Sequence, residues 1–218
     1  MEHLLEGLLP TEILASATTI NDCVDDLLPE ERGVIAKAVA SRQREFATGR
    51  VLSRRLLSGL GHPEFPLLRD DDRVPCWPGG VVGSISHTRS SASSLCVAAV
   101  GRASAFQGIG VDCEPDEPVE RDVERVVCRG DEHAWVADGV GEDERGRRCR
   151  IVFSVKEAVY KAFYPRTRVY WSFQDVLVSV DLEAGRYHAE LPASAGRSAV
   201  EGRVYRRDGW ILSASVVG

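Results

Sequence analysis

The chain has 218 residues, of which 33 are acidic and 27 are lysine or arginine, giving a formal net charge of -6. Proteins that bind nucleic acids or anionic membranes are usually basic, so this balance argues against both kinds of partner. Hydrophobic residues make up 44% of the chain, which is enough to form a core and argues against disorder of the whole chain. The length suits one domain or two small lobes.

Six cysteines are spread along the chain without a CxxC pair and without a histidine at zinc spacing, which argues against a structural zinc site. The sequence does not open with the basic and then apolar pattern of a secretion signal. No apolar run approaches the roughly 18 residues expected of a membrane span. We therefore expect a cytoplasmic protein whose cysteines are reduced.

The first half of the chain predicts one long helix followed by strands. Residues 1–28 mix apolar and polar residues and indicate a strand or irregular structure. Pro29-Glu30-Glu31 suits the first turn of a helix, and an apolar stripe at helical spacing continues to Gly61, a natural end for that helix. Residues 62–80 are rich in Pro, Asp and Gly and predict a loop. Strands are expected next, at 81–87, 95–100 and 109–114.

The second half predicts another helix and then a β-rich tail. Residues 115–150 carry dense charge and several glycines, which indicates a short helix and then a mobile loop. A second helix is expected over about 154–164, ending before Pro165. Asp208-Gly209 is a strong hairpin signal, and hairpins pair strands in antiparallel fashion, so the predicted fold class is α+β. The remaining strands are expected at 176–182, 187–191, 204–206 and 210–217.

One candidate metal site follows the expected strand at 109–114. Side chains at alternate positions of a strand share a face, so Asp112 and Glu114 can converge on one point. Two carboxylates at a strand end are also common as solvated residues, and that reading stays open for the pair alone. The preceding Gly108-Ile109-Gly110 favours a functional role, because glycines in a strand let another element or a ligand approach the backbone closely.

A second group of charges lies on the helix expected at 154–164. Glu157 is flanked by Lys156 and Lys161, and a third carboxylate beside two ammonium groups suits a magnesium ion that holds a phosphate-bearing substrate. Two ordinary interpretations compete with this one. Glu157 could close a capping box with Ser154, or form an i,i+4 salt bridge with Lys161.

Candidate anion-binding residues precede these acids. Arg42 and Arg50 lie eight residues apart on the first helix, about 80° apart around its axis, and could lean over one groove. Guanidinium groups bind phosphate well, although exposed arginines on a helix are more often simply solvated. Ser86-His87 could donate to a phosphate. The sequence around this pair lacks the GxSxG spacing of a serine hydrolase, and the chain has neither a Walker A sequence nor GxGxxG.

Taken together and in this order, these blocks resemble the 4′-phosphopantetheinyl transferases of the surfactin-synthetase and enterobactin-synthetase activating type. The combination of (V/I)-D-x-E with F-x-x-K-E-x-x-x-K is highly specific, whereas either motif alone would be moderately so. The matching segments are 42–50, 75–78 with 83–87, 110–114 and 153–163.

The resemblance implies an enzyme that moves the 4′-phosphopantetheine arm of coenzyme A onto a serine of an apo carrier protein and releases adenosine 3′,5′-bisphosphate. It also implies two α+β lobes related by a pseudo-twofold axis, each with a small antiparallel sheet packed on a long helix. Coenzyme A would lie between them. The N-terminal lobe would span 1–104 and hold the nucleotide end, and the C-terminal lobe would span 105–218 and hold the metal and catalytic residues.

The family's functional residues can be carried over by motif. The metal ligands for Mg²⁺ would be Asp112, Glu114 and Glu157, and the catalytic residues Asp112, Glu157 and Lys161. The nucleotide end would contact Arg42, Arg50, Ser86 and His87, with Arg69 or Arg73 nearby. The pyrophosphate would contact Lys156 and Lys161. The pantetheine channel would be lined by Tyr160 with Tyr170 or Trp171. Cys113 is a poor magnesium ligand, so we expect water at that coordination position.

The expected partners are coenzyme A and an apo acyl or peptidyl carrier protein, with no nucleic acid and no membrane, and the protein is expected to be a monomer. Carrier proteins are typically acidic, so arginines of the second lobe are candidate docking residues. These are Arg121, Arg125, Arg129, Arg145, Arg147, Arg148, Arg166 and Arg168. Two other functions remain open: a magnesium-dependent phosphodiesterase or nucleotidyl transferase, and a non-catalytic protein that binds coenzyme A or a carrier.

Overall fold

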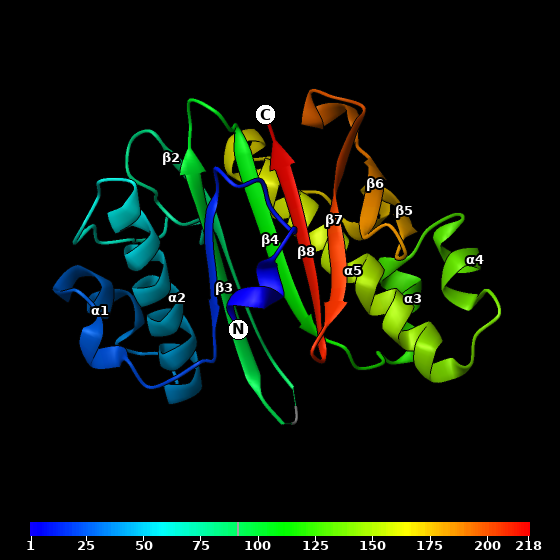
Figure 1. The fold of residues 1–218 in the computed structure, drawn as a ribbon, viewed down its shortest axis with the longest axis horizontal. Coiled ribbons are helices and arrows are strands. Elements are labelled where there is room, and N and C mark those ends of the chain that lie inside the picture. The colour runs from blue at the N-terminus through cyan, green and yellow to red at the C-terminus, as the bar shows by residue number, and fades with distance from the viewer. Residues whose placement is uncertain (91) are drawn as a thin grey trace.

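The computed structural model describes residues 1–90 and 92–218 and contains two antiparallel sheets with a long helix on each (Figure 1). The first sheet has the strand order β1-β3-β2. Its strands are β1 (Leu14–Thr18), β2 (Val81–Arg89) and β3 (Ser94–Arg102). Helix α2 (Ala40–Gly59) packs on β1 and β3, and α1 (Pro29–Ile35) precedes it.

The second sheet has the strand order β4-β8-β7-β6-β5. Its strands are β4 (Gly108–Pro115), β5 (Leu177–Asp181), β6 (Arg186–Glu190), β7 (Ala199–Arg207) and β8 (Trp210–Val217). Helix α5 (Glu142–Thr167) crosses one face, and the short helices α3 (Arg121–Val127) and α4 (Glu132–Ala137) lie beside its first half. Short 3-10 turns are found at Glu2–Leu5, Val24–Asp26, Phe173–Asp175 and Ala193–Ala195. This arrangement confirms the α+β class, whereas the pseudo-twofold relation stays a prediction.

The two sheets meet where β2 lies beside β4 (Figure 1). The backbone amide of Val111 in β4 donates to Ser84 Oγ of β2 at 3.1 Å. A serine side chain thus accepts from this amide in the place of a backbone carbonyl of a paired strand. Beneath this joint the sheets share one hydrophobic core, in which β3, β4 and β8 all take part. Leu4 and Leu8, from the first ten residues, complete that core.

The N-terminal segment therefore packs against the second sheet as well as the first. Arg207 of β7 donates to the backbone carbonyls of His3, Leu4 and Glu6. A further hydrogen bond runs from the Tyr205 hydroxyl to the carbonyl of Gly7 at 3.1 Å. These contacts tie the start of the chain to the hairpin near its end.

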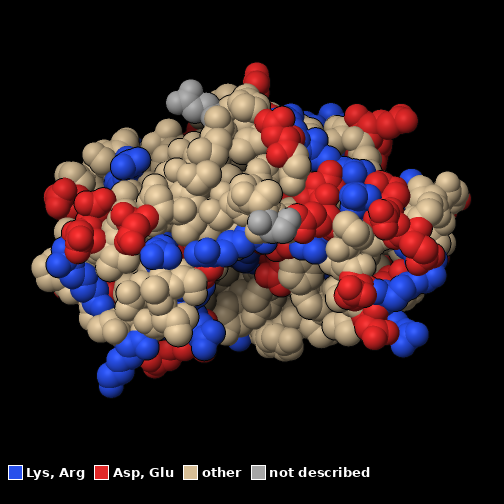
Figure 2. Space-filling model, turned by 90° about the horizontal axis from the view of Figure 1, so that it is seen from below, with Lys and Arg blue, Asp and Glu red and all other residues tan. Residues whose placement is uncertain are grey.

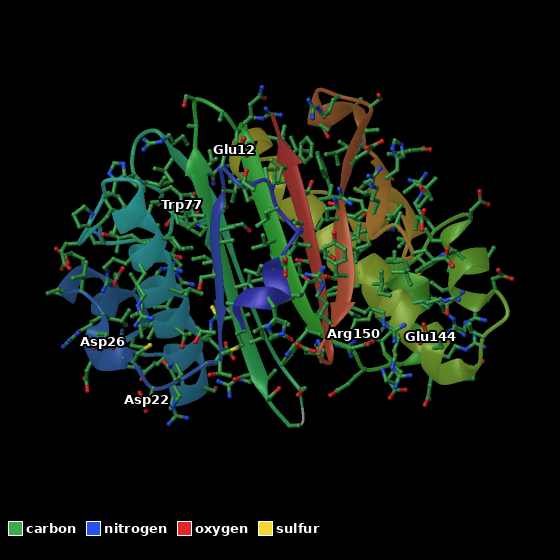
Figure 3. All side chains as sticks on the ribbon, in the orientation of Figure 1. Glu12, Asp22, Asp26, Trp77, Glu144 and Arg150 are labelled. Atoms are coloured by element: carbon green, nitrogen blue, oxygen red, sulfur yellow. The ribbon has the colours of Figure 1, made fainter. Side chains whose placement is uncertain are left out.

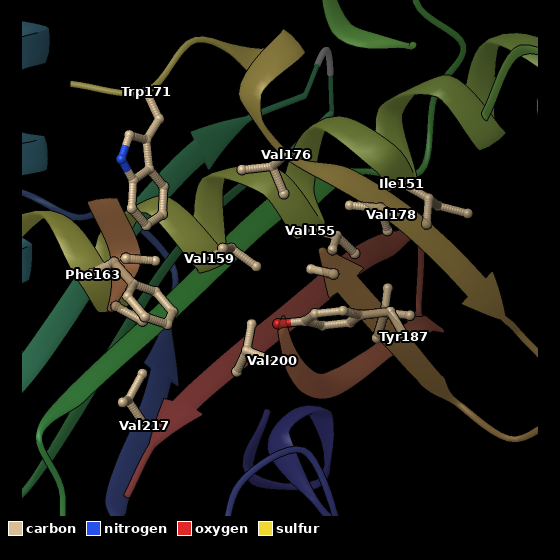
Figure 4. Packing of buried hydrophobic residues seen from close by; sticks show 14 of the residues in the cluster. Ile151, Val155, Val159, Phe163, Trp171, Val176, Val178, Tyr187, Val200 and Val217 are labelled. Atoms are coloured by element: carbon tan, nitrogen blue, oxygen red, sulfur yellow. The ribbon is translucent and has the colours of Figure 1, made fainter. Parts of the chain in front are cut away.

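A separate core lies between α5 and the outer strands of the second sheet (Figure 4). Val155, Val159 and Phe163 come from one face of α5 and are fully buried. They pack against β6, β7 and β8, where Tyr187 donates its hydroxyl to the carbonyl of Ala214 at 2.9 Å. This core holds α5 rigidly on the sheet.

On the side of β4, α5 approaches the strand so closely that only glycine fits. A Cβ atom on Gly110 would lie 1.8 Å from the carbonyl oxygen of Ala158, and one on Gly108 would lie 2.1 Å from that of Ala162. The expected close approach at Gly108-Ile109-Gly110 is confirmed, and the partner is the backbone of α5. The contact sets β4 and α5 at a fixed distance.

The first long helix is interrupted, in contrast to the single helix expected from Pro29 to Gly61. The break lets Glu31 of α1, which is fully buried, accept hydrogen bonds from Arg54 of α2 and from the amide of Leu67. In one continuous helix, residues 23 positions apart would be separated by roughly 34 Å. The burial of this ion pair therefore requires two helices.

Residues 115–150 contain α3, α4 and the start of α5, where a short helix and a mobile loop were expected. The charges of this segment have partners inside the fold: buried Glu132 accepts from the amides of Arg129 and Val178 at 2.7 and 2.6 Å. Gly146, which suggested a loop, is a point of close contact, since its Cβ would lie 2.7 Å from Pro118.

The early start of α5 also removes the capping-box interpretation. Ser154 lies in the interior of the helix and donates to Ser213 Oγ of β8 at 3.0 Å. The hairpin at Asp208-Gly209 is confirmed, with φ of 48° and 79°, the left-handed values that a two-residue turn of this kind requires. No helix in the described part of the chain is both long and apolar enough to cross a membrane.

We predict that Gly110→Ala lowers the free energy of unfolding by at least about 2 kcal/mol, because β4 and α5 must move apart to admit the methyl group. Gly33→Ala is the control, because Gly33 lies in α1 with no atom within 4 Å of its would-be Cβ. This control should be neutral or stabilise by roughly 0.5–1 kcal/mol. Urea denaturation followed by circular dichroism measures both. Equal stability of the two variants would contradict the close approach.

Candidate active site

A cavity of about 230 Å³ is lined by α2, the 62–80 loop, β2 and the C-terminal half of α5. Of the residues predicted to contact coenzyme A, Ser86, Lys156, Tyr170 and Trp171 do not line it. Those that line it are Arg42, Arg50, Arg69, Arg73, His87, Tyr160 and Lys161. Five of these side chains are cationic, so the cavity suits an anionic ligand.

Arg50 forms the buried base of this cavity. Its Nε donates to the carbonyl of Leu67 at 2.7 Å, and its guanidinium lies over the ring of Phe46, 4.1 Å from the centroid. Burial, with a smaller effect of the charges of Arg69 and Arg42, lowers the pKa of Arg50 to about 10, and the charge of Glu31 opposes this. No carboxylate within the described residues pairs with it directly. A buried cation of this kind is stabilised by a bound anion.

Arg69 and Arg73 both line the cavity, so the two arginines are not exclusive alternatives. A tight turn presents them: the Asp70 amide donates to the carbonyl of Val74 at 3.0 Å, and the Val74 amide donates to Asp70 Oδ1 at 2.9 Å. Arg73 adopts a left-handed backbone with φ of 67°. Asp70 Oδ2 accepts from Arg168 at 2.6 Å, which ties this turn to the end of α5.

His87 and Arg42 meet at another wall of the cavity. Arg42 Nη1 lies 2.8 Å from His87 Nε2 and donates to Glu45 Oε2 at 3.1 Å. Arg89 also donates to Glu45, at 3.1 Å. Our sequence analysis did not select Glu45, although its i,i+3 spacing from Arg42 on one helix was a usable signal.

Asp112 lies where the cavity reaches the second lobe. Its Oδ1 accepts from Ser86 Oγ at 2.8 Å and from Lys161 Nζ at 2.6 Å, and Lys161 also donates to Ser86 at 3.0 Å. Burial alone would lower the pKa of Lys161, but the charges of Asp112 and Glu157 outweigh that effect and raise it. Lys161 therefore stays cationic. Ser86, which lies on β2 of the other sheet, donates a hydrogen bond to Asp112.

The other two predicted metal ligands are also electrostatically linked to Asp112. Burial and then the charge of Asp112 raise the pKa of Glu114 to about 7, while Arg150, which donates to it at 2.9 Å, lowers it. Burial is also the main cause of the raised pKa of Glu157, with Asp112 adding to it and Lys161 opposing it. Arg150 lies near the end of β4 and the start of β8 (Figure 3). Its role was missed because the sequence does not show that α5 extends to it.

Asp112, Glu114 and Glu157 are the candidate ligands of a cation. Within the described residues, no group of three His, Cys, Asp or Glu side chains is arranged as a ready metal site. Two observations nevertheless fit a divalent cation here. The Oδ2 atom of Asp112 is buried and has no hydrogen-bond partner among the described residues, and the charge of Asp112 penalises ionisation of both glutamates. Hard carboxylate oxygens are also the ligands that magnesium prefers.

Comparison with known proteins gives the family. The model of the 4′-phosphopantetheinyl transferase N-terminal domain matches residues 30–101, and that of the 4′-phosphopantetheinyl transferase superfamily matches residues 108–214. The 4′-phosphopantetheinyl transferase Svp of Streptomyces mobaraensis is 37% identical over 203 residues, covering 90% of this chain and 81% of Svp. The chain belongs to the 4′-phosphopantetheinyl transferase superfamily.

Two further relatives carry the same family name. The 4′-phosphopantetheinyl transferase Npt of Nocardia iowensis is 30% identical over 227 residues, covering 97% of this chain and 98% of Npt. The 4′-phosphopantetheinyl transferase PptT of Mycobacterium tuberculosis is 35% identical over 161 residues, covering 72% of this chain and 66% of PptT. Such likeness over most of the chain identifies a transferase enzyme.

In this transferase the structure corrects the prediction for Lys156. Its side chain is 2% exposed, and its Nζ donates to Glu132 Oε2 at 2.7 Å and to the carbonyls of Val127 and Phe173, both at 2.8 Å. Lys156 and Lys161 are five residues apart, about 140° around the helix, so they cannot face one ligand. Lys156 stabilises the packing of α3, α4 and the 3-10 turn at Phe173–Asp175.

The tyrosines at the end of α5 form an aromatic wall. Tyr160 stacks on Tyr164 with a centroid distance of 4.9 Å, and Tyr170 packs edge-on against Tyr160 at 6.2 Å. Tyr164 lines the cavity and was not selected from the sequence, although it is one helical turn from Tyr160. Trp171 is turned into the core, where it packs on Phe163 and donates to Ser194. Tyr170 is therefore the neighbour of Tyr160 in this wall.

The eight arginines proposed for docking all have partners within the transferase. Acidic and basic side chains lie side by side over α3, α4 and the start of α5, on the right of Figure 2. Carboxylates pair with Arg121, Arg125, Arg145, Arg147 and Arg168. Backbone carbonyls or a side-chain amide accept from Arg129, Arg148 and Arg166. Docking through these arginines stays a prediction, and it would compete with these contacts.

We predict that Lys156→Met lowers the free energy of unfolding by about 3–5 kcal/mol, since it leaves Glu132 buried without its ammonium partner. Affinity for coenzyme A in the folded protein should be unchanged. Denaturant titration measures the first quantity and calorimetry the second. The control is the double variant Lys156→Met with Glu132→Gln, which should recover part of the lost stability. If the variant instead binds coenzyme A more weakly and keeps full stability, the result would support the predicted contact of Lys156 with the pyrophosphate.

Proposed function

We propose that this transferase moves the 4′-phosphopantetheine arm of coenzyme A to a serine of an apo carrier protein, with Mg²⁺ as its metal. The observation that carries the proposal is one continuous arrangement of charge. A cavity lined by arginines of the first lobe leads to Lys161, and Lys161 leads to the three carboxylates of the second lobe. Relatives named 4′-phosphopantetheinyl transferases support the same reaction.

The cationic end of the cavity is assigned to the nucleotide half of coenzyme A. Arg42, Arg50 and His87 would bind its 3′-phosphate, with Arg69 and Arg73 closing over it from the 62–80 loop. Guanidinium groups recognise phosphate through paired hydrogen bonds, and the partial burial of Arg50 strengthens them. The aromatic wall at Tyr160 is assigned to the pantetheine arm.

Asp112, Glu114 and Glu157 are the residues that would hold Mg²⁺ against the pyrophosphate. Bound there, the cation would offset the negative charge that develops on the phosphate oxygens during transfer. Arg150 neutralises Glu114 in the structure, and Lys161 neutralises Asp112. Arg150 opposes the rise in the pKa of Glu114 that burial and the charge of Asp112 cause.

The chemistry assigned to this chain's residues balances as follows. The oxygen of the carrier serine forms a bond to the phosphorus that bears pantetheine, and the bond from that phosphorus to the bridging oxygen breaks. Adenosine 3′,5′-bisphosphate leaves with the electron pair of that bond. Glu157 takes the serine proton, a role suited to a carboxylate whose pKa is raised by burial. The ammonium of Lys161 would stabilise the leaving group.

We predict that Glu157→Gln slows transfer at least about 100-fold, because a general base is lost, while affinity for adenosine 3′,5′-bisphosphate is largely retained. Transfer is measured as a gain of about 340 Da on an apo carrier incubated with coenzyme A and Mg²⁺. Glu183→Gln, a matched substitution in the exposed turn before β6, should behave as wild type. Near-normal transfer by Glu157→Gln would reject its role, and no transfer by wild type across a panel of carriers would reject the function.

We predict that Arg50→Lys weakens binding of coenzyme A about tenfold and leaves binding of 3′-dephospho-coenzyme A nearly unchanged. Lysine keeps the charge but cannot form the paired hydrogen bonds of a guanidinium. Arg55→Lys is the control, since Arg55 is exposed on the same helix and does not line the cavity. Calorimetric titration of both ligands gives the ratio of affinities. An equal loss for both would place Arg50 away from the 3′-phosphate.

A further inference from the structure

Glu45 is out of place in a cavity built for an anion. It is the only carboxylate among the described residues that line the cavity, where it faces the same space as several arginines. Its side chain is 17% exposed, so its charge is only partly solvated. A carboxylate in this position repels a phosphate unless it does something else for binding.

The contacts of Glu45 indicate how this carboxylate can help binding. Arg42 uses one nitrogen, Nη1, to donate both to Glu45 Oε2 at 3.1 Å and to His87 Nε2 at 2.8 Å. A guanidinium can only donate, so His87 Nε2 accepts and carries no proton. The proton of the neutral ring is therefore on Nδ1, the atom that lies 3.8 Å from Glu45 Oε2.

This state of His87 cannot contact a phosphate dianion through Nε2, because both atoms would be acceptors. A neutral ring could donate through Nε2 only by giving up its Nδ1 proton, and Nδ1 would then face Glu45 Oε2 at 3.8 Å as a second acceptor. For His87 to donate to the phosphate while Nδ1 keeps its proton toward Glu45, Arg42 must release Nε2 and the ring must gain a second proton. A phosphate monoester has a second pKa near 6, so above pH 7 the ligand brings no spare proton. The proton must then come from solvent.

The groups around His87 mostly oppose that second proton. Arg42 of α2, Arg89 of β2 itself and Lys161 of α5 all place positive charge near the ring, and together with burial they lower the pKa of His87. Glu45 is the one carboxylate that acts in the other direction. It also accepts from Arg89 and Arg42, which keeps both guanidinium groups directed to this wall.

We infer that Glu45 is a positioning residue that lets His87 take up a proton when a phosphate monoester enters the cavity. The inference rests on the proposed function for the identity of that phosphate, the 3′-phosphate of the nucleotide. Binding of the nucleotide is then coupled to proton uptake. Affinity falls as the pH rises from 7 to 8.5, because the free histidine is neutral and the bound histidine is charged.

The wild-type protein provides the first test. Adenosine 3′,5′-bisphosphate is titrated at pH 7.8 in two buffers that differ in ionisation enthalpy, and the difference in heat gives the number of protons taken up. We expect close to one proton for the bisphosphate and none for adenosine 5′-monophosphate, which lacks the 3′-phosphate. His87→Asn should abolish the uptake. Binding of the bisphosphate without uptake overturns the inference, whatever the variants do.

The second test separates positioning from simple repulsion. If Glu45 only repelled the ligand, Glu45→Gln would bind the bisphosphate more tightly. We expect instead a loss of about tenfold at pH 7 and an affinity that no longer changes from pH 7 to 8.5. Glu183→Gln changes the net charge equally, far from the cavity, and should keep the wild-type pH profile.

The outcomes are distinct from those of the proposed function. Tighter binding by Glu45→Gln, or an unchanged pH slope, overturns the role of Glu45 and leaves the transferase assignment standing. If the wild-type protein binds neither nucleotide, the proposed function fails and this inference fails with it. Circular dichroism of each variant shows whether a loss of affinity comes from a loss of fold.

Discussion

The packing of α5 against β4 is the constraint on which the rest of the structure depends. Gly108 and Gly110 remove two side chains, so the strand backbone lies directly against the helix carbonyls of Ala162 and Ala158. Beyond these glycines the strand presents Asp112 beside Lys161. Any larger residue at the glycines would widen the gap and separate the charges that the site requires. The placement of Asp112 beside Lys161 is thus a consequence of backbone packing.

The first and second sheets contribute different charged groups to the site. The first sheet and its helix supply cations around a cavity, and the second supplies carboxylates held by Lys161 and Arg150. Ser86 is one of the polar connections between them, since it donates to Asp112 from the opposite sheet. A ligand with a phosphate at one end would match the cations of the first part, whereas a diphosphate further along would need a cation between it and the carboxylates of the second part.

Much of the fold and of the cavity could be predicted from the sequence because the signals are local. The strand positions, the turn at Asp208-Gly209 and the close approach at Gly110 depend on neighbours in sequence or on residue size alone, and all are found. The errors concern residues whose role is set by distant partners. The break before α2 is required by the pairing of Glu31 with Arg54, and the turning of Lys156 away from the cavity by buried Glu132. No pattern of neighbouring residues in the sequence predicts either pairing.

The path of the first ten residues has a consequence for how the chain is divided. A cut between 104 and 105 follows the family-model boundary, yet Leu4 and Leu8 pack into a core that β4 and β8 complete, and Arg207 grips the carbonyls of His3, Leu4 and Glu6. Each half taken alone would leave part of its hydrophobic surface exposed to solvent. The cut therefore divides the sequence but not the hydrophobic core, which the first residues share with the strands near residue 217.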